Sequence, residues 1–325
     1  MKRRAFCRVV AVTGAMLGGH ALAQSPPLRV AFVSTDSKDA PSPNFAAFRE
    51  GMRALGYTEG RNLVLDAWWG DGSADRVTKL TPEILATRPN VIVAAGGLAL
   101  FPLQRSGIKV PLVFSISADP VEARIVESFA HPGGTLTGIS LFTLALVGKR
   151  LELLCEVLPR AQRIALVTNP QHPGERKEFD VAQASAQRLG LTVRYLPVSS
   201  SAALDTAFAD IAKTRDDAIV AFADGFTLGH AARFAEFSRQ TRIPAIDGWA
   251  PFAEAGNLMI YGPVITDVYR RLAQYVDRIA KGAAPGDLPI ELPTKVELVV
   301  NAGAAKAMGI QVPSSVLARA DRVIA

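Results

Sequence analysis

The chain of 325 residues is 49% hydrophobic and 20% charged, which is typical of a globular protein and excludes a disordered chain. One compact domain is usually shorter than this, so we expect two lobes. The formal net charge of +6 falls to +2 once residues 1–23 are set aside, because they carry four basic residues and no acid. This weak charge argues against nucleic acid as a partner.

The N-terminal segment has the features of a cleavable export signal. A basic start is followed by an apolar stretch, which Arg8 makes too short to span a bilayer, and by small residues at Ala21 and Ala23. We expect cleavage after Ala23 and a periplasmic location. Arg3 and Arg4 also resemble a twin-arginine signal, although many ordinary signals carry two arginines.

Short apolar runs alternate with amphipathic stretches in the first half of the chain. Near-continuous apolar strands in such an alternation indicate a parallel sheet covered by helices on both faces. The predicted strands are 28–34, 62–69, 90–97 and 111–117, and the predicted helices are 44–56, 74–87 and a short helix from Leu98.

The same alternation starts again at Lys149, which predicts an α/β protein of two doubly wound, Rossmann-like lobes with parallel sheets. The Gly- and Pro-rich segment 131–143 lies between the two units and is typical of a crossing point. In the second unit the predicted strands are 163–169, 191–198, 218–224, 243–249 and 257–263, and the helices are 149–158, 176–190, 203–214 and 231–240. A helix over 267–281 and a strand over 295–301 remain, and we expect both to return to the two lobes.

Two adjacent tryptophans end the second predicted strand. Ligands of open parallel sheets bind outside the carboxyl ends of the strands, so Trp68 and Trp69 lie at the mouth of an expected cleft. Strand side chains alternate, so one ring can pack against a helix while the other faces the cleft. Trp249 offers an aromatic ring from the other lobe. The alternative is that these rings only seal the sheets.

Polar groups follow several other strands. Gly96 and Gly97 precede a helix whose first N–H groups can hold an anion, or they can simply make a tight turn. Asp119 and Asp224 are suited to an ammonium group, although an Asp at such a place commonly caps the next helix. Neutral hydrogen-bonding groups, which can also cap turns, are Ser34, Thr35, Ser115, Ser117 and Asn169.

Motifs of known catalytic sites are absent from the sequence. There is no nucleophile elbow, phosphate-binding loop, dinucleotide fingerprint or zinc-protease motif. His131, His172 and His230 are scattered without metal-ligand spacing. Cys155 is the single cysteine after the signal and lies in an apolar helix, which indicates packing and no internal disulfide. We expect no cofactor or metal, and an enzyme on the same scaffold is the alternative.

Several motifs occur in order along the chain: GYTEGRNL, HPGGTLTGIS, KRLELL, NLMIYGP, PTKVELVVNAGAAKAMGIQVP and LARADRVI. From about Leu28 to the C-terminus, this set resembles the ABC-transporter substrate-binding protein family that includes tryptophan- and tyrosine-binding members. The resemblance implies a type I periplasmic binding protein with three crossings between its lobes, a small-molecule ligand held between them, and a membrane permease as partner. Amino-acid-binding members often have Thr or Ser after the glycine pair, where this chain has Leu98.

On this basis we predict an N-terminal lobe of 24–140 plus 263–293 and a C-terminal lobe of 141–262 plus 294–325. We expect a monomer that binds a small, partly apolar ligand, aromatic or amino-acid-like, without catalysis. A sugar is the alternative ligand, and a sensory module for a membrane receptor is the alternative to transport. The predicted ligand-binding residues are Ser34, Thr35, Trp68, Trp69, Gly96, Gly97, Leu98, Ser115, Ser117, Asp119, Asn169, Asp224, Trp249 and Tyr261.

Overall fold

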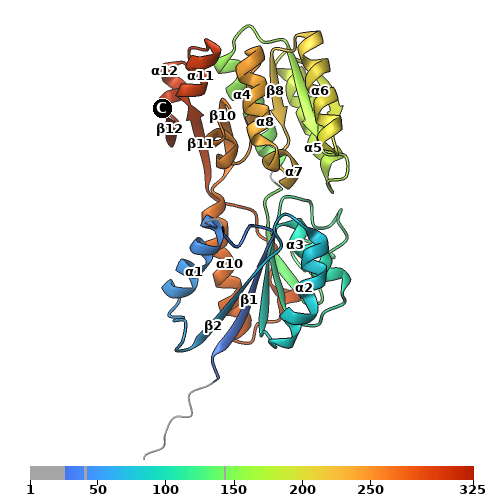
Figure 1. The fold of residues 1–325 in the computed structure, drawn as a ribbon, viewed down its shortest axis with the longest axis vertical. Helices are drawn as coiled ribbons and strands as arrows, with labels where there is room; N and C mark the ends of the chain where they lie inside the picture. The colour runs from blue at the N-terminus through green and yellow to red at the C-terminus, as the bar shows by residue number, and fades with distance from the viewer. Residues whose placement is uncertain (1–25, 40–41, 143) are drawn as a thin grey trace, which may run out of the picture.

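A computed structural model describes residues 26–39, 42–142 and 144–325 of the chain. The predicted export signal lies outside the described residues. The described residues form two α/β lobes placed end to end (Figure 1). Within these ranges, no helix is both long and apolar enough to cross a membrane.

The N-terminal lobe is built, in the described chain, on a five-stranded parallel sheet with the order β2-β1-β3-β4-β5. Residues 30–33 and 91–95 of its interior strands are buried without interruption, because helices cover both faces of the sheet. The strands are β1 (Leu28–Ser34), β2 (Leu63–Trp69), β3 (Val91–Ala95), β4 (Leu112–Ile116) and β5 (Leu136–Ser140).

Two helices pack on each face of this sheet. Phe48 and Leu272, from the first and last of these helices, share an apolar cluster with Phe32. The next strand residue, Val33, points to the opposite face and packs in a second cluster. The helices are α1 (Pro43–Ala54) and α10 (Ile265–Ala280) on one face, and α2 (Ala74–Ala86) and α3 (Gly97–Arg105) on the other.

The C-terminal lobe is built on a mostly parallel sheet, for which the described residues give the order β12-β11-β10-β9-β8-β6-β7. Only the β10–β11 pair among these is antiparallel. Its strands are β6 (Arg163–Thr168), β7 (Thr192–Pro197), β8 (Ala218–Ala221), β9 (Ala245–Asp247), β10 (Met259–Pro263), β11 (Val296–Asn301) and β12 (Arg322–Ile324).

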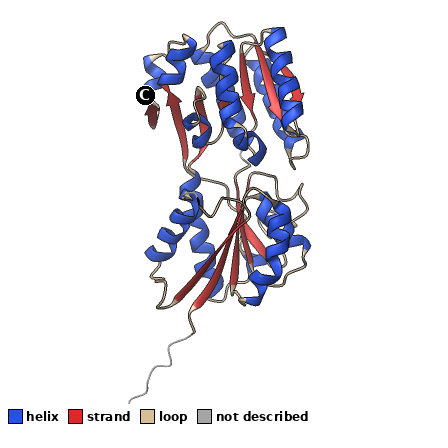
Figure 2. Ribbon diagram, viewed as in Figure 1, coloured by secondary structure: helices blue, strands red, loops and turns tan. Residues whose placement is uncertain are grey.

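Helices also cover both faces of the C-terminal sheet, as the layers in Figure 2 show. The helices of one face are α4 (Leu144–Val157), α5 (Glu175–Arg188), α11 (Ala302–Met308) and α12 (Ser314–Leu317). Those of the other face are α6 (Ser201–Thr214), α8 (Ala231–Thr241) and α9 (Ala250–Glu254), and the short α7 (Gly225–Gly229) follows β8.

The chain passes between the lobes three times: from β5 to α4, from β10 to α10, and from the segment after the 3-10 helix η1 (Pro285–Asp287) to β11. The first and third passages lie side by side, because Ile139 and Glu291 form an isolated bridge. The first two passages leave the carboxyl ends of β5 and β10, so each sheet turns that edge toward the other lobe. The predicted architecture of two doubly wound lobes with three crossings is therefore confirmed.

The sequence pattern does not predict strand β5, which falls within the expected crossing segment. Gly138 interrupts its apolar pattern, and a glycine usually weakens a strand. Here the glycine is required, because a Cβ at position 138 would lie 2.1 Å from the carbonyl oxygen of Phe114 on β4. Strand β5 therefore depends on close pairing with β4, which the glycine permits, and not on a local apolar pattern. The pattern also does not predict the short helices α7, α9, α11 and α12 or the edge strand β12.

Candidate functional site

The loops that follow strands β4 and β6 join the two lobes at their facing edges. Ser117 Oγ lies 2.9 Å from His172 Nε2, and the Asp119 N–H donates to the carbonyl of Pro173 at 3.2 Å. Burial lowers the pKa of His172, although Asp224 and Glu175 oppose this shift. The His172 ring is therefore neutral at neutral pH.

A lysine on α5 extends this contact with two ion pairs. Lys177 Nζ lies 3.0 Å from Asp119 Oδ2 and 2.7 Å from Glu122 Oε1, and both acids belong to the N-terminal lobe. Gly174 lies close to Asp119, and a Cβ at position 174 would come within 2.7 Å of the Phe142 ring. The two lobes are thus in close contact on this side of the space between them.

Lys177→Met should shift the unliganded protein toward more open arrangements, because a contact made only in the described arrangement favours that arrangement. The shift should be small, roughly threefold in population, since the lysine is half-exposed and water screens the pairs. An increased radius of gyration in small-angle X-ray scattering would show it. Lys149→Met is the matched control, because Lys149 pairs with Glu152 within α4. An unchanged radius for Lys177→Met would contradict the expectation.

The paired tryptophans point to opposite faces of the edge strand β2, as predicted. Trp69 packs edge-on against Phe45 of α1, with ring centroids 5.5 Å apart. Trp68 packs on the other face, in the cluster that contains Val77 of α2. Both rings therefore contact helices and both remain partly exposed. The buried Nε1–H of Trp68 has no hydrogen-bond partner among the described residues, so it is a free donor.

The glycine pair forms the start of helix α3. Gly96 is the N-cap with φ of +88°, a conformation that favours glycine, and its N–H donates to the carbonyl of Ser115 at 2.9 Å. No side chain caps this helix. Leu98 is 49% exposed in the first turn. The turn therefore offers backbone N–H groups beside an apolar surface.

The predicted neutral groups of the N-terminal lobe take part in internal hydrogen bonds. Ser34 Oγ accepts from the N–H of Asp36 at 3.0 Å, and Ser115 Oγ donates to the Tyr269 hydroxyl at 3.0 Å. The carbonyl of Thr35 accepts from the N–H of Gly72 at 2.7 Å. The contacts of Ser34 and Thr35 hold the loops after β1 and β2 in place, and that of Ser115 joins β4 to α10.

Both predicted carboxylates cap the turns that follow them. Asp224 Oδ1 accepts from the N–H of Thr227 at 2.7 Å, and its Oδ2 accepts from the Asn169 side chain at 2.9 Å. Asp119 Oδ1 accepts from the N–H of Val121 at 2.9 Å, while its Oδ2 faces Lys177. Asp224 thus caps helix α7, as the alternative states, whereas Asp119 caps a turn that no helix follows directly.

The C-terminal lobe contributes Trp249 at the start of α9 and Tyr261 on β10. Trp249 is only 9% exposed. A buried charge cluster lies beside these residues, and its members were not among the predicted site residues: Arg150, Glu175, Glu178 and Asp247. Nothing in the local sequence marks Arg150, because the motif KRLELL also contains the charged residues Lys149 and Glu152.

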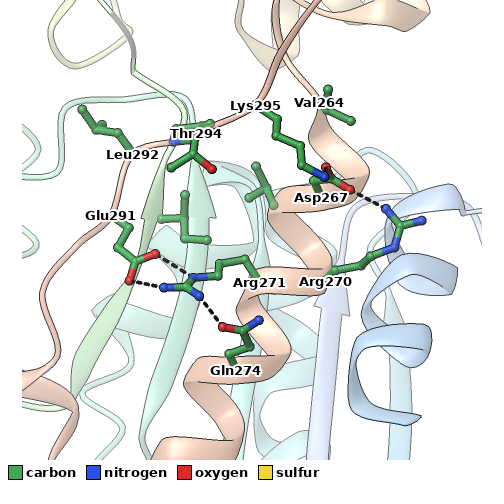
Figure 3. A pocket seen from close by; sticks show the side chains of 12 residues that line it. Val264, Asp267, Arg270, Arg271, Gln274, Glu291, Leu292, Thr294 and Lys295 are labelled. Carbon is green, nitrogen blue, oxygen red and sulfur yellow. Dashed lines mark hydrogen bonds and ion pairs between the residues drawn. The ribbon is translucent and has the colours of Figure 1, made fainter. Parts of the chain in front are cut away.

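Two cavities of the described chain lie away from these residues. One, of about 420 Å³, lies between α10 and the third passage (Figure 3). There Arg271 forms a two-pronged pair with Glu291, at 2.8 Å for both contacts, and Lys295 pairs with Asp267 at 2.7 Å. The other, of about 430 Å³, lies between α8, α9 and α11. None of the predicted ligand-binding residues lines either cavity, so their roles remain predictions.

The described residues contain no cluster of His, Cys, Asp and Glu that could hold a metal ion. Cys155 is half-buried, and burial raises the pKa of its thiol. A raised pKa disfavours the reactive thiolate.

Comparison with known proteins gives matches over nearly the whole chain. Residues 29–324 match a family model described as ABC transporter substrate binding protein. The tyrosine-binding protein of Clostridioides difficile (strain R20291) is 20% identical over 264 residues, which cover 81% of this chain and 76% of that protein.

Two solved structures are also similar. A conserved domain protein from Vibrio cholerae has a TM-score of 0.80 and 26% identity, covering 91% of this chain and 99% of that one. An ABC domain in complex with L-Trp from Streptococcus pneumonia has a TM-score of 0.82 and 21% identity, covering 92% and 100%. These likenesses agree with the two-lobed fold described above.

Proposed function

Because the chain belongs to the ABC transporter substrate binding protein family, we propose that it binds a small aromatic amino acid between its lobes and delivers it to a membrane permease. The family match confirms the resemblance found in the sequence motifs. The observation that best supports binding between the lobes is that both sheets turn their carboxyl edges toward each other, where ligands of such sheets bind. Movement about the three passages would admit and release the ligand.

The aromatic character of the ligand is supported by the relatives and by the ring residues. One relative is named a tyrosine-binding protein, and one similar structure holds L-Trp. Trp68 or Trp69 would contact the ring of the ligand from the N-terminal lobe and Trp249 from the C-terminal lobe.

The polar ends of an amino acid would be held by different elements. The N–H groups at Gly97 and Leu98 would bind the carboxylate, aided by the dipole of α3. The ammonium group would contact Asp224, whose Oδ2 accepts from the neutral Asn169 amide, whereas Asp119 Oδ2 already pairs with the charged Lys177. The neutral groups Ser117 and Asn169 would add hydrogen bonds at the rim.

Location and assembly follow from the same proposal. The protein would be exported by the segment 1–23, act in the periplasm as a monomer and release its ligand unchanged. We also propose that the N-terminal lobe comprises 24–140 plus 263–293 and the C-terminal lobe 141–262 plus 294–325.

Isothermal titration of the purified mature chain with L-tryptophan and L-tyrosine tests the function. We expect saturable 1:1 binding, with L-leucine and D-glucose as controls that bind more weakly. A ligand at 100 times its Kd should raise the free energy of unfolding by about 2.7 kcal/mol. Recovery of the ligand unchanged, checked by mass spectrometry, would separate binding from catalysis. Binding of neither aromatic amino acid would exclude the proposed ligand class.

Trp68→Ala and Trp249→Ala should each weaken the binding of the better amino acid by roughly tenfold, because each removes one aromatic contact with the ligand ring. Trp68→Phe keeps an aromatic ring, so a smaller loss is expected. Titration of each variant, after circular dichroism confirms folding, measures this. Unchanged affinity in Trp68→Ala and Trp69→Ala alike would rule out stacking by the N-terminal lobe.

A further inference from the structure

A buried arginine lies inside the C-terminal lobe, on helix α4. Arg150 is only 3% exposed, and its helix neighbours Val147, Leu151 and Leu154 belong to the apolar core. A buried charge is costly unless partners compensate it. The partners of Arg150 therefore show what its position serves.

The guanidinium of Arg150 contacts the two segments that carry Trp249 and Tyr261. Its Nε donates to the carbonyl of Tyr261 on β10 at 2.9 Å. Its Nη2 occupies the space beside Gly248. A Cβ built at position 248 would lie only 2.3 Å from Arg150 Nη2. A side chain at position 248 would thus displace the guanidinium, so glycine is required there by Arg150.

Acidic residues surround the guanidinium and hold the same turn. Glu178 Oε1 of α5 lies 3.5 Å from Arg150 Nη1, and Asp247 ends the neighbouring strand β9. Asp247 Oδ1 accepts from the N–H groups of Gly248 and Trp249, the latter at 2.9 Å. Among the described residues, Asp247 Oδ2 and Arg150 Nη1 have no hydrogen-bond partner, and the charge of Arg150 acts on Asp247.

The cluster contains more acids than bases. Burial raises the pKa of Glu178 and of Asp247 to about 7 each, while the charge of Arg150 lowers both. Asp224 after β8 and Glu175 on α5 add negative charge, and the neutral His172 lies beside both of these acids. Arg150 is therefore the charge that favours ionised Glu178 and Asp247 above neutral pH.

We propose that Arg150 is a positioning residue of the ligand site, which holds the Gly248–Trp249 turn and β10 at Tyr261 in the geometry that presents both rings to the ligand. The role of Arg150 in binding rests on the function proposed above, whereas its hold on the Trp249 turn does not. Trp249 is the single tryptophan of the C-terminal lobe, so its spectrum reports on this turn without any ligand.

The first experiment measures Trp249 in the Trp68→Phe/Trp69→Phe background. Arg150→Met and Gly248→Ala should both shift the fluorescence maximum and the near-ultraviolet circular dichroism of Trp249, because each removes the guanidinium from the turn. Arg150→Lys keeps the charge but loses the planar fork, so it should restore the spectrum in part. Lys149→Met, on the same helix, should leave it unchanged. An unchanged spectrum in folded Gly248→Ala would overturn the proposal.

The second experiment titrates L-tryptophan and L-tyrosine into the same substitutions in the natural background. Arg150→Met should weaken binding by roughly tenfold or more, Arg150→Lys less, and Gly248→Ala about as much as Arg150→Met. In the unmodified chain, affinity should increase as the pH rises through 7, because ionised Glu178 and Asp247 hold the guanidinium. This pH dependence should be lost in Arg150→Met.

The outcomes separate the two proposals. If the unmodified chain binds neither amino acid, the proposed ligand is wrong, and the Trp249 spectrum still tests positioning. If Arg150→Met does not fold, Arg150→Lys and Gly248→Ala carry the same expectations. Affinity that falls with unchanged Trp249 spectrum and unchanged pH dependence would show a general loss of stability instead of positioning.

Discussion

Gly262→Ala should destabilise the protein by about 3 kcal/mol or more, one of the largest effects that a single methyl group can have. Gly262 lies on β10, and a Cβ there would lie 1.8 Å from the carbonyl oxygen of Gly248. The neighbouring backbone cannot move away easily, because the Arg150 guanidinium fills the space beside Gly248. The new methyl group would therefore force β9 and β10 apart. Urea denaturation followed by circular dichroism measures the loss.

Gly225→Ala is the matched control for this substitution. Gly225 is the first residue of α7, and a Cβ there would meet no atom within 4 Å. Alanine is a better helix former than glycine, so this variant should be as stable as the unmodified chain or slightly more stable. A Gly262→Ala variant whose stability matches that of Gly225→Ala would mean that the two backbones do not approach as closely as described.

Elements with strong local patterns could be predicted from the sequence. Residues 30–33 of β1 and all of β3 are uninterrupted apolar runs, and α1 has an apolar face and a glycine just after its end, so hydrophobic pattern alone was sufficient. Strand β5 could not be found in this way, because its stability comes from pairing with β4 around Gly138. The edge strand β12 is three residues long and mostly exposed, so it has no distinctive pattern.

The general location of the candidate site could also be predicted, because the order of strands and helices fixes which loops lie at the carboxyl edges. The contacts that each side chain makes there could not be predicted. Asp119 and Asp224 follow strands in the same way, yet Asp119 also pairs with Lys177, 58 residues further along the chain. Such contacts depend on how the lobes meet, which local sequence does not encode.

The buried charge cluster shows this limit most clearly. Arg150 on α4 receives its partners from α5 and from strands β9 and β10, up to 111 residues away in sequence. The helix motif KRLELL contains three charged residues and does not mark Arg150 as the one that is buried and needs a partner. It does not indicate which partner either. Only the fold shows that Arg150 contacts the segments that carry Trp249 and Tyr261.

Glu178→Gln should become progressively more stable than the unmodified chain as the pH rises from 4.5 to about 8. Burial raises the pKa of Glu178 from 4.5 to about 7 in the folded state. Between these values the folded chain keeps a proton that the unfolded chain has lost, so the free energy of unfolding falls as the pH rises. A glutamine has no proton to lose and removes this fall. The difference between the two proteins should grow by roughly 3 kcal/mol across the range.

Comparing Glu178→Gln with the unmodified chain at each pH isolates the effect of the Glu178 proton on stability. The lowered pKa of His172 has the opposite influence, since stability rises with pH as the unfolded histidine loses its proton, and it cancels in the difference. Any pH-independent cost of removing a partner from Arg150 cancels in the slope as well. Asp247→Asn should behave like Glu178→Gln, because burial also raises the pKa of Asp247 to about 7.

The control for this experiment is Glu236→Gln on the surface of α8. Arg239 and Gln240 lower the pKa of this exposed glutamate, so its replacement should show no gain in stability with rising pH. Urea unfolding at pH 4.5, 6, 7 and 8 gives the four free energies for each protein. A constant difference between Glu178→Gln and the unmodified chain would mean that Arg150 keeps Glu178 ionised throughout, as a fully formed ion pair.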